Sequence, residues 1–555
     1  MDTADVERLI RGGEAMRVEF KGEEREKLPD REIYEAIVCL ANGEGGTLLL
    51  GVENDRRVTG ARPRNLDQLQ AAILSNTVPS ITTVVSEHTV DELPVVVIEL
   101  VHKPGVYATA RGKSVRRVMG AEGPRCDPFF PYQHVGRRSD LGELDYSALV
   151  VGGATWADLD PLEFERVRQT IRGRPDADKR LLDFTDDREL AKALGLVQTV
   201  EARLVPNVAG LLLLGRKEVL RRFVPSHDVA FQVISSRAAV PKNEFFRAPL
   251  LKTLEAVEEH FSARNDEQEV TVGMFRLPIP DYSLDAFREA VNNAVVHRDY
   301  AQLGTVHIQM HPDHLLVTNP GGFVAGITLD NLLVHEPKPR NPRLADAFRR
   351  LGLVERTGRG IDRIYLEQLR YGRPVPDYTQ SSSDGVRLVL RGGKASLEFA
   401  AFAYEQEKAD APLDLDELLV LNRLQHERRA DAPTVGGLTQ RGEAHARSVL
   451  ERLVERGLIE ARGERRGRVY HLSAELYRRL GEPAGYVRAH GFDPIRQEAM
   501  VMEYVVAHGK IARRDAARLC SLGDHQATRL LRRLRDKGKL VLRGEKRGAY
   551  YELAE

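Results

Sequence analysis

Three polar side chains recur every fourth residue in one segment of the sequence, DAFREAVNNAVVHRDY (285–300). They are Glu289, Asn293 and His297. Residues three or four apart are neighbours on a helix surface, so the three share one strip beside the apolar side. An amide oxygen is a suitable ligand for Mg²⁺, and a carboxylate one turn earlier is placed to orient or deprotonate a water. The spacing alone is equally typical of a solvated polar face, which stays open as an alternative.

Two glycine-containing segments downstream favour the ligand-binding interpretation. Asn319-Pro320-Gly321-Gly322 ends a predicted strand, where glycine lets the backbone approach a ligand closely. Gly358-Arg359-Gly360 stands directly before a predicted helix, whose N–H groups and dipole favour phosphate. A Glu-x-x-x-Asn helix followed by two glycine loops resembles the order of a Bergerat-type ATP-binding fold.

The elements that must position these residues alternate between strand and helix. Short apolar runs bounded by glycine or charge, such as GTLLLGVEND, LPVVVIELV, NVAGLLLLG and VAFQVI, predict strands, and DREIYEAIVCLAN has the apolar spacing of a helix. The fold class is therefore α/β and multidomain. The predicted parts are an α+β domain at 1–135, a helical connector at 136–199, an α/β sandwich at 200–400 and two small units at 411–480 and 494–555.

The two small C-terminal units are predicted from an internal repeat. RSVLERLVERGLIEARGERRGRVYHL, which begins at Arg447, aligns without gaps with TRLLRRLRDKGKLVLRGEKRGAYYEL, which begins at Thr528. Each copy has an amphipathic helix, a glycine, a strand, a basic hairpin tip and a second strand, with helices upstream. This order predicts two winged helix-turn-helix units.

Basic residues of the repeat are the candidate contacts to double-stranded DNA. From Pro494 to Glu555 there are 14 basic and 8 acidic side chains, whereas the whole chain is balanced at 82 of each. Wing tips would contact phosphate and helices would contact bases. The candidates are Arg465, Arg466, Arg468, Lys546 and Arg547 in the wings, and Gln526, Arg529 and Arg533 on the last helix. A protein-interaction role for winged helices stays open, and the nearly neutral first copy is compatible with a structural or dimerising role.

Cysteine usage and hydropathy bear on the compartment. Cys39, Cys126 and Cys520 are far apart and without paired spacing, which predicts neither a zinc cluster nor a disulfide framework and favours a reducing cytosol. The N-terminus has no apolar leader, and no apolar run approaches the roughly 18 residues of a membrane span. We therefore expect a soluble cytoplasmic protein without membrane association.

The central motifs resemble the RecG-like C-terminal, GHKL-related ATP-binding domain. The residues that carry the resemblance are FREAVNNAVVHRDY, NPGGF, KPRNPRLADAF and RTGRGIDRI, within about 200–375. The resemblance implies that Asn293 is a ligand of Mg²⁺, that Glu289 orients the attacking water of a weak ATPase, and that Asn319 stands at the adenine-binding position. The other implied nucleotide contacts are Gly321, Gly322, Lys338, Gly358, Arg359 and Gly360.

Two further residues of this region are interpreted structurally or left open. His297 is interpreted as a cap of the helix end, since cations are favourable at helix C-termini. Lys338 and Arg340 are predicted either as charge partners of the nucleotide or as residues that tie down a proline-rich loop.

The N-terminal region resembles the Schlafen AlbA_2 domain. GGEAMRVEFKG and CLANGEGGTLLLGVEND carry the resemblance over roughly 1–135. Some members of that family are RNA-cutting nucleases with three acids; two fall here on Glu14 and Glu19, and the third falls on Asn54. Nucleic-acid or protein binding without cleavage is therefore favoured, with Arg116 and Arg117 as candidate phosphate contacts. Glu19 is equally suited to a simple pair with Lys21 along a strand.

Together these patterns predict an ATP-binding, DNA-binding transcriptional regulator. No Gly-Lys-Ser/Thr phosphate loop occurs in the sequence, which excludes a P-loop motor. The alternatives are a metal-dependent nuclease of antiphage defence and a nucleic-acid-binding scaffold that needs no nucleotide. Paired winged helices are also compatible with a homodimer on a two-fold DNA site.

Overall fold

Five strands form the central sheet, in the order β12-β11-β15-β16-β17. They are β11 (Val229–Val233), β12 (Lys242–Phe246), β15 (Val306–Met310), β16 (His314–Pro320) and β17 (Gly385–Arg391). Strands β11 and β15 pair in parallel and the other neighbours are antiparallel. Along β15, Val306, Ile308 and Met310 are buried while His307 and Gln309 between them are half-buried, so one face of the sheet carries the core.

The structure is a computed structural model. It describes residues 1–101, 105–120, 123–235, 240–272, 275–354, 360–392, 396–463, 468–480, 494–520, 524–544 and 549–554.

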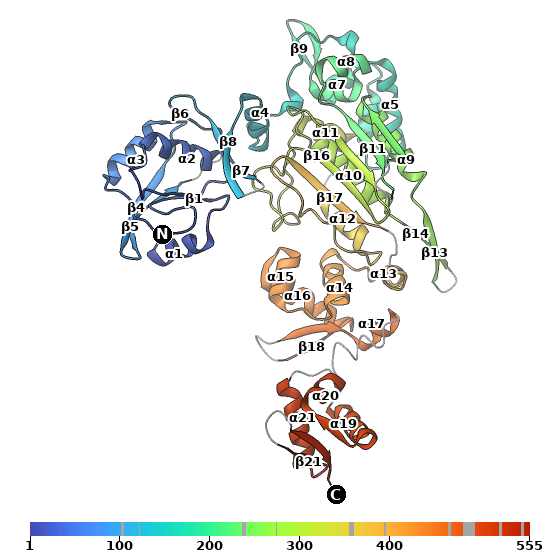
Figure 1. Ribbon diagram of the computed structural model, residues 1–555. Helices are drawn as coiled ribbons and strands as arrows, with labels where there is room; N and C mark the ends of the chain where they lie inside the picture. Colours follow the sequence, from blue (N-terminus) through green and yellow to red (C-terminus); the bar gives the residue numbers. More distant parts are fainter. Residues whose placement is uncertain are drawn as a thin grey trace.

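Helices α9 (Leu250–Ser262), α10 (Leu284–Val296) and α12 (Gly360–Leu369) pack together over the core face of the sheet (Figure 1). The start of α10 is capped by Ser283, whose hydroxyl accepts a hydrogen bond from the Ala286 N–H at 3.4 Å. Phe287 of α10 stacks on Phe261 of α9, with ring centroids 3.7 Å apart. This buried side fixes the rotation of α10 and with it the direction of the polar strip.

Residues 131–228 build the part of the domain above the sheet in Figure 1, and α11 (Pro342–Arg350) and the hairpin of β13 (Glu267–Val272) and β14 (Phe275–Pro280) complete the domain. The elements of 131–228 are α4 (Pro131–Asp140), α5 (Pro161–Gly173), α6 (Asp187–Ala193), β9 (Val197–Val200), β10 (Arg203–Pro206), α7 (Val208–Leu214) and α8 (Lys217–Phe223), with 3-10 turns at Tyr146–Ala148, Trp156–Asp158 and Lys179–Asp183. One hydrophobic core runs from Ala154 to Leu390. The segment 136–199 therefore shares a core with the sheet.

The run NVAGLLLLG forms the helix α7, so the predicted strand is wrong. Asn207 caps α7 by accepting a hydrogen bond from the Gly210 N–H at 2.8 Å. Every residue from Val208 to Leu214 is buried, and a helix buried on all sides shows no helical period in its sequence.

A second sheet, in the order β1-β2-β5-β4, forms the N-terminal domain. Its strands are β1 (Val18–Lys21), β2 (Thr47–Leu50), β4 (Thr83–Val90) and β5 (Leu93–Leu100), with α1 (Thr3–Gly12), α2 (Asp30–Asn42) and α3 (Leu66–Ser75). Two small two-stranded sheets complete it: β3 (Thr77–Val78) pairs with β6 (Ala108–Thr109), and β7 (Val115–Gly120) forms a hairpin with β8 (Gly123–Pro128). Leu48 and Leu50 pack in one core and Leu49 in another, so both faces of this sheet are covered.

One disulfide joins the β7–β8 hairpin to α2. Cys39 is buried on α2 and Cys126 lies on β8, with their Cα atoms 5.8 Å apart at a sequence separation of 87. The expectation of no disulfide is wrong, because the fold of the domain brings together cysteines that are distant in the sequence. Cys520 is free and buried.

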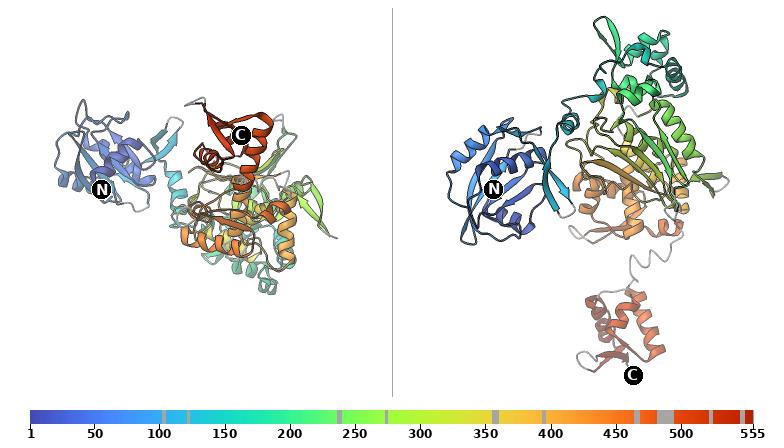
Figure 2. Two further views of the ribbon diagram at one scale, coloured as in Figure 1. Left: turned by 90° about the horizontal axis from the view of Figure 1, so that it is seen from below. Right: turned by 45° about the horizontal axis from the view of Figure 1, so that its top comes forward.

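Two small units follow the central domain. The core of the first includes Leu369 of α12, whereas the core of the second contains residues of that unit alone. The first contains α13 (Leu397–Lys408), α14 (Leu415–Glu427), α15 (Ala432–Thr439), α16 (Gly442–Glu455), β18 (Ile459–Arg462), β19 (Val469–Leu472) and α17 (Ala474–Arg479). The second contains α19 (Pro494–His508), β20 (Lys510–Ala512), α20 (Arg513–Leu519), α21 (Asp524–Asp536), β21 (Leu540–Arg543) and β22 (Tyr550–Leu553). Figure 2 shows the second unit beyond the first, on a different side of the central domain from the N-terminal domain. Within the described part of the chain, no helix combines the length and the apolarity needed to cross a membrane.

Candidate functional site

A cavity of about 740 Å³ lies between α10, the end of β16, the start of α12 and the loop before α11. Its lining includes the whole polar strip of α10. The predicted site residues that contribute to it are Glu289, Asn293, Asn319, Gly322, Lys338 and Gly360, and His297, predicted as a cap of the helix end, lines it as well. Residues that are far apart in the sequence are therefore gathered around one space, whereas Gly358 and Arg359 lie outside the described residues.

Glu289 and Asn293 face the beginning of α12 across this cavity. A Cβ at Gly360 would lie 1.8 Å from the Glu289 carboxylate oxygen, so any side chain there would displace that carboxylate from its present position. The side chain of Asn293 is half-buried and makes no hydrogen bond to any described residue, which leaves its amide open toward the cavity. An open amide beside a carboxylate fits the oxygen donors that Mg²⁺ prefers.

The protein ligands for such an ion are few. Among the described residues no group of three or more His, Cys, Asp or Glu side chains is arranged to hold a metal.

The end of β16 forms the other side of the cavity. Asn319 is buried, and its amide N–H₂ donates to the carbonyls of Pro320 (3.2 Å) and Gly321 (3.4 Å). Gly321 has a left-handed φ of 89°, and a Cβ there would meet Arg340. Because the amide nitrogen of Asn319 is directed at its own backbone, its oxygen is the atom left to accept from a ligand.

Arg340 holds the strand end and the helix end together. Its buried guanidinium donates to the carbonyls of Gly322 (2.7 Å) and His297 (3.0 Å) and to the carboxylate of Asp140 on α4 (2.6 Å). Of the two alternatives for this residue, the contacts therefore support the structural one. Lys338 lines the cavity and donates to the Ala325 carbonyl at 3.1 Å, which spans the loop.

His297 stands at the end of α10, and its backbone N–H donates to the Asn293 carbonyl at 2.9 Å. Burial and the nearby charge of Arg340 lower the pKa of His297 to about 4, so the imidazole is neutral at neutral pH. The position at the helix end is as expected, but the reason given for it, a cation at the helix C-terminus, is wrong.

Two lining residues were not found from the sequence. Tyr378 is buried against Phe323, with ring centroids 6.0 Å apart, and burial together with Tyr365 and Glu289 raises its pKa. Arg441 belongs to the first C-terminal unit and lines the cavity from there. Neither residue stands in a recognisable pattern, because both reach the cavity through tertiary contacts alone.

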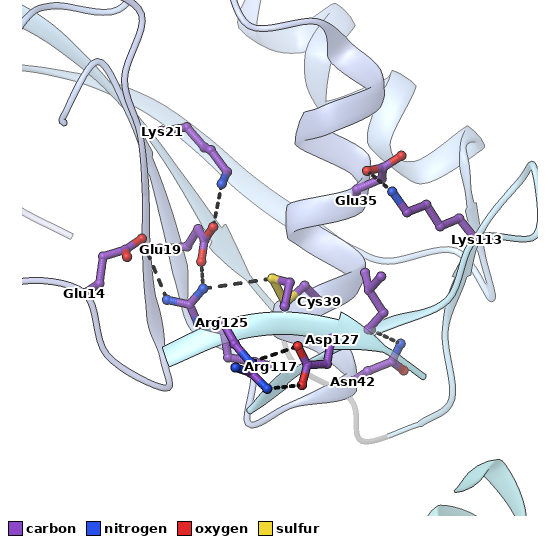
Figure 3. Close-up of a disulfide and its surroundings, with 12 residues drawn as sticks. Glu14, Glu19, Lys21, Glu35, Cys39, Asn42, Lys113, Arg117, Arg125 and Asp127 are labelled. Carbon is purple, nitrogen blue, oxygen red and sulfur yellow. Dashed lines mark hydrogen bonds and ion pairs between the residues drawn. A yellow bond between two sulfur atoms is a disulfide. The ribbon is translucent and has the colours of Figure 1, made fainter. Parts of the chain in front are cut away.

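The two predicted nuclease acids, Glu14 and Glu19, form ion pairs with the buried Arg117 (Figure 3). Arg117 is 2% exposed; it forms an ion pair with Glu19, which is 4% exposed, and lies 3.8 Å from Glu14. Lys21 pairs with Glu19 as well, at 2.8 Å, as the strand spacing predicted. Arg117 is therefore not placed to contact DNA phosphate, because its charge is buried and used inside the domain.

The third acid position of the family is occupied by exposed Asn54. The acids on either side of it are engaged elsewhere: Glu53 accepts from the Thr59 hydroxyl at 2.8 Å, and Asp55 pairs with Arg57 at 2.7 Å. Arg116 is half-exposed, with its guanidinium over the ring of Phe129 at 5.7 Å.

The basic residues of the second C-terminal unit separate into two groups. Arg529 and Arg532 on α21 are exposed and have no partner among the described residues, and Gln526 is exposed one turn earlier. Arg533 instead points back to Glu498 of α19 at 3.8 Å, so its charge is partly used within the unit. Arg532 was not predicted from the sequence, because which residues of α21 are exposed becomes clear only when its buried side is known.

The remaining predicted DNA contacts lie in the wings. Arg468 lies over the ring of Tyr470 at 5.3 Å. Four others are outside the described residues, namely Arg465, Arg466, Lys546 and Arg547.

Three family models match the chain in succession. Residues 14–123 match the Schlafen AlbA_2 model, 135–230 match a domain of unknown function (DUF8451), and 304–390 match the C-terminal region of the putative ATP-dependent DNA helicase RecG (HATPase_c_4). None of the curated proteins matches by sequence.

A solved structure has a similar fold over nearly the whole length. It is the crystal structure of the DIP2311 protein from Corynebacterium diphtheriae, with a TM-score of 0.50 and 22% sequence identity over 99% of this chain and 98% of that one. At this identity the likeness concerns the fold. The family matches place the chain among nucleic-acid-related proteins of the ATP-binding type. This protein therefore joins a Schlafen AlbA_2 domain to a RecG-type C-terminal ATPase-like domain.

Proposed function

We propose that the protein binds ATP with Mg²⁺ in the cavity beside α10, and that the nucleotide state controls binding of double-stranded DNA, as in a transcriptional regulator. The observation that carries the proposal is the placement of Glu289 and Asn293 on one wall of a 740 Å³ cavity, with the glycine-opened start of α12 opposite them. A volume of this size suits a ligand as large as a nucleotide.

The residues of the cavity have separable roles in this proposal. Asn293 offers an amide oxygen to Mg²⁺, which when bound neutralises phosphate charge. The start of α12 presents backbone N–H groups to phosphate. Asn319 accepts from the adenine amino group, and Glu289 orients a water for slow hydrolysis. The buried Arg340 keeps the strand end and α10 at a fixed separation.

Calorimetry with ATP and Mg²⁺ on the full chain tests nucleotide binding. We expect binding by the wild type and a loss of at least about tenfold in Asn293→Ala, since a bond to a charged partner is worth roughly 1.5–3 kcal/mol. Gln309→Ala is the matched control, because Gln309 lies on β15 and pairs with Gln232 away from the cavity. Equal affinities for the wild type, Asn293→Ala and Gln309→Ala would contradict the assigned metal ligand.

For DNA binding we propose the second C-terminal unit as the reader. Its order of helix, strand, two helices and hairpin is that of a winged helix-turn-helix, in which the third helix enters the major groove. Exposed Arg529 and Arg532 on this helix, α21, support the proposal. In the first unit the positions that align with Arg529 and Arg532 hold Ser448 and Glu451, so the corresponding helix face carries no such cations.

Fluorescence anisotropy across a salt series tests the reader. Arg529 and Arg532 bring two positive charges to the DNA whether they reach bases or phosphates, so replacing both by alanine should flatten the slope of log K against log salt by up to about 1.8, at about 0.9 for each phosphate neutralised. The control replaces Arg447 and Arg478, which are exposed on the first unit and paired with Glu443 and Glu475. An unchanged slope in the α21 variant would assign the contact to another surface.

A further inference from the structure

One residue that lines the cavity belongs to the first C-terminal unit. Nearly all of the lining lies between Glu289 and Leu388, but Arg441 belongs to the first C-terminal unit. Arg441 stands in the turn after α15 and directly precedes α16, which follows α14 and α15 as the third helix of the predicted winged helix-turn-helix. The cavity is therefore lined in part by a unit whose core also includes Leu369 of α12.

The turn that carries Arg441 is fastened to a loop of the cavity. Gln440 accepts a hydrogen bond from the Leu333 N–H and donates one to the Leu329 carbonyl, both at 2.7 Å. Leu332 packs against the core of the central domain, whereas Leu333 packs against the core of the first C-terminal unit. The loop between Leu329 and Leu333 thus contacts both the central domain and the first C-terminal unit.

Arg441 shares its acidic partner with a histidine of the same unit. Its guanidinium lies 3.2 Å from a carboxylate oxygen of Asp416, and the same oxygen lies 2.7 Å from the Nε2 atom of His445. The Arg441 side chain is nearly half exposed whereas that of Asp416 is 13% exposed, so the arginine can turn away while the carboxylate keeps His445 as a partner. A phosphate group carries more charge than one carboxylate and is a strong partner for arginine.

We propose, on the basis of the nucleotide site proposed above, that Arg441 leaves Asp416 for the phosphates of the bound nucleotide and so reports occupancy to the first C-terminal unit. Asp416 retains His445 as its partner when Arg441 turns away. Coupling requires a contact that differs between the empty and the bound state, and the exchange of partners by Arg441 is such a contact.

The surroundings of α16 fit a linking role for the first unit. In a winged helix the start of the third helix enters the DNA groove. Here the turn before that helix carries Gln440, which is hydrogen-bonded to the central domain, and Arg441, which lines the cavity. The first unit is then the link that senses the nucleotide, and the second unit is left as the DNA reader.

The test combines two titrations of the full chain in the wild type, Arg441→Ala and Gln440→Ala. One measures the affinities for ATP, ADP and AMP with Mg²⁺ by calorimetry, and the other measures the affinity for DNA with and without ATP. We expect Arg441→Ala to weaken ATP by about 10- to 100-fold, the range for a lost bond to a charged group, and AMP much less. Gln440→Ala should keep ATP affinity, and both variants should lose the ATP-dependent change in DNA affinity.

Arg447→Ala is the matched control, because Arg447 lies on the same helix, is exposed and pairs with Glu443. If Arg441→Ala keeps both its ATP affinity and the ATP-dependent change, the inference is wrong while the nucleotide site stands. If ATP fails to bind even to the wild type, the site itself is wrong, and the two failures are thereby distinguished.

Discussion

The buried pair of Glu19 and Arg117 gives the sharpest test of how the N-terminal domain is held together. We consider Arg117→Met, which removes the charge and keeps most of the apolar length. The variant takes from Glu19 its buried partner and leaves it the half-exposed Lys21 at 2.8 Å. It also leaves the Ala15 and Val18 carbonyls, which accept from Arg117 at 3.2 and 2.9 Å, without that donor.

These losses set the expected magnitude. Removing one partner of a buried ion pair costs about 3–5 kcal/mol, and the remaining Lys21 favours the lower end, about 3 kcal/mol. The double variant Glu19→Gln with Arg117→Met removes the uncompensated charge as well. It should therefore be less destabilised than the sum of the single changes, by about 1 kcal/mol or more.

Hydrogen exchange read by mass spectrometry in the full chain measures this locally, in peptides that cover β1 and β2. A loss of about 3 kcal/mol corresponds to roughly a 100-fold loss of protection where exchange follows opening of the domain. Arg125→Met is the matched control on the same hairpin, because Arg125 pairs with Asp127 at an exposed position and should cost at most about 1 kcal/mol. Equal effects of the two variants would refute the argument from burial. Unchanged protection with weakened nucleic-acid binding would return Arg117 to the phosphate contact first predicted.

Three further outcomes are expected. Burial lowers the pKa of His227, which is 3% exposed, to about 4, so the unfolded chain binds a proton below about 6.5 that the folded chain refuses. Stability should fall as the pH drops from about 6.5 to about 4, by roughly 3 kcal/mol at this site, and His227→Gln should flatten that part of a denaturation series. Alkylation of the denatured but unreduced protein should label one thiol, Cys520, whereas prior reduction should give three labels by intact mass. Gly360→Ala should displace the Glu289 carboxylate and lower ATP turnover more than ATP affinity; equal losses in both would place the disturbance in binding.

The sequence was most informative where a local pattern repeats or has a fixed spacing. The strip on α10 follows from a period of four residues, and the two C-terminal units follow from one alignment within the chain. Both are features of neighbouring residues, which a sequence displays directly. The prediction of a strand for the apolar run of α7 was wrong because that run has no such pattern. With every position buried, no period in the sequence distinguishes a helix from a strand.

What the sequence did not reveal are the contacts between distant segments. Gln440 bonds to Leu333 across 107 residues, and the disulfide joins positions separated by 87. Arg117 shows the same limit in another form. A basic residue on a strand was interpreted as a surface contact, but its burial depends on the acids of β1 and the preceding turn. The residue type alone does not show whether a charged side chain is buried in an ion pair within the domain or exposed to a ligand.

The two flanks of the cavity differ in how readily their charges exchange. On the N-terminal side, Arg340 is buried and binds Asp140 of α4 together with two backbone carbonyls, so separating it from these partners would leave an uncompensated charge, a cost of about 3–5 kcal/mol. On the C-terminal side, Arg441 is nearly half exposed, and its partner Asp416, which is 13% exposed, also has His445 at 2.7 Å. Release of Arg441 would therefore leave the carboxylate with a second partner, whereas release of Arg340 would leave a buried charge without one. On the proposal that Arg441 exchanges Asp416 for phosphate, we expect a bound anion to displace Arg441 and to leave Arg340 and α4 in place.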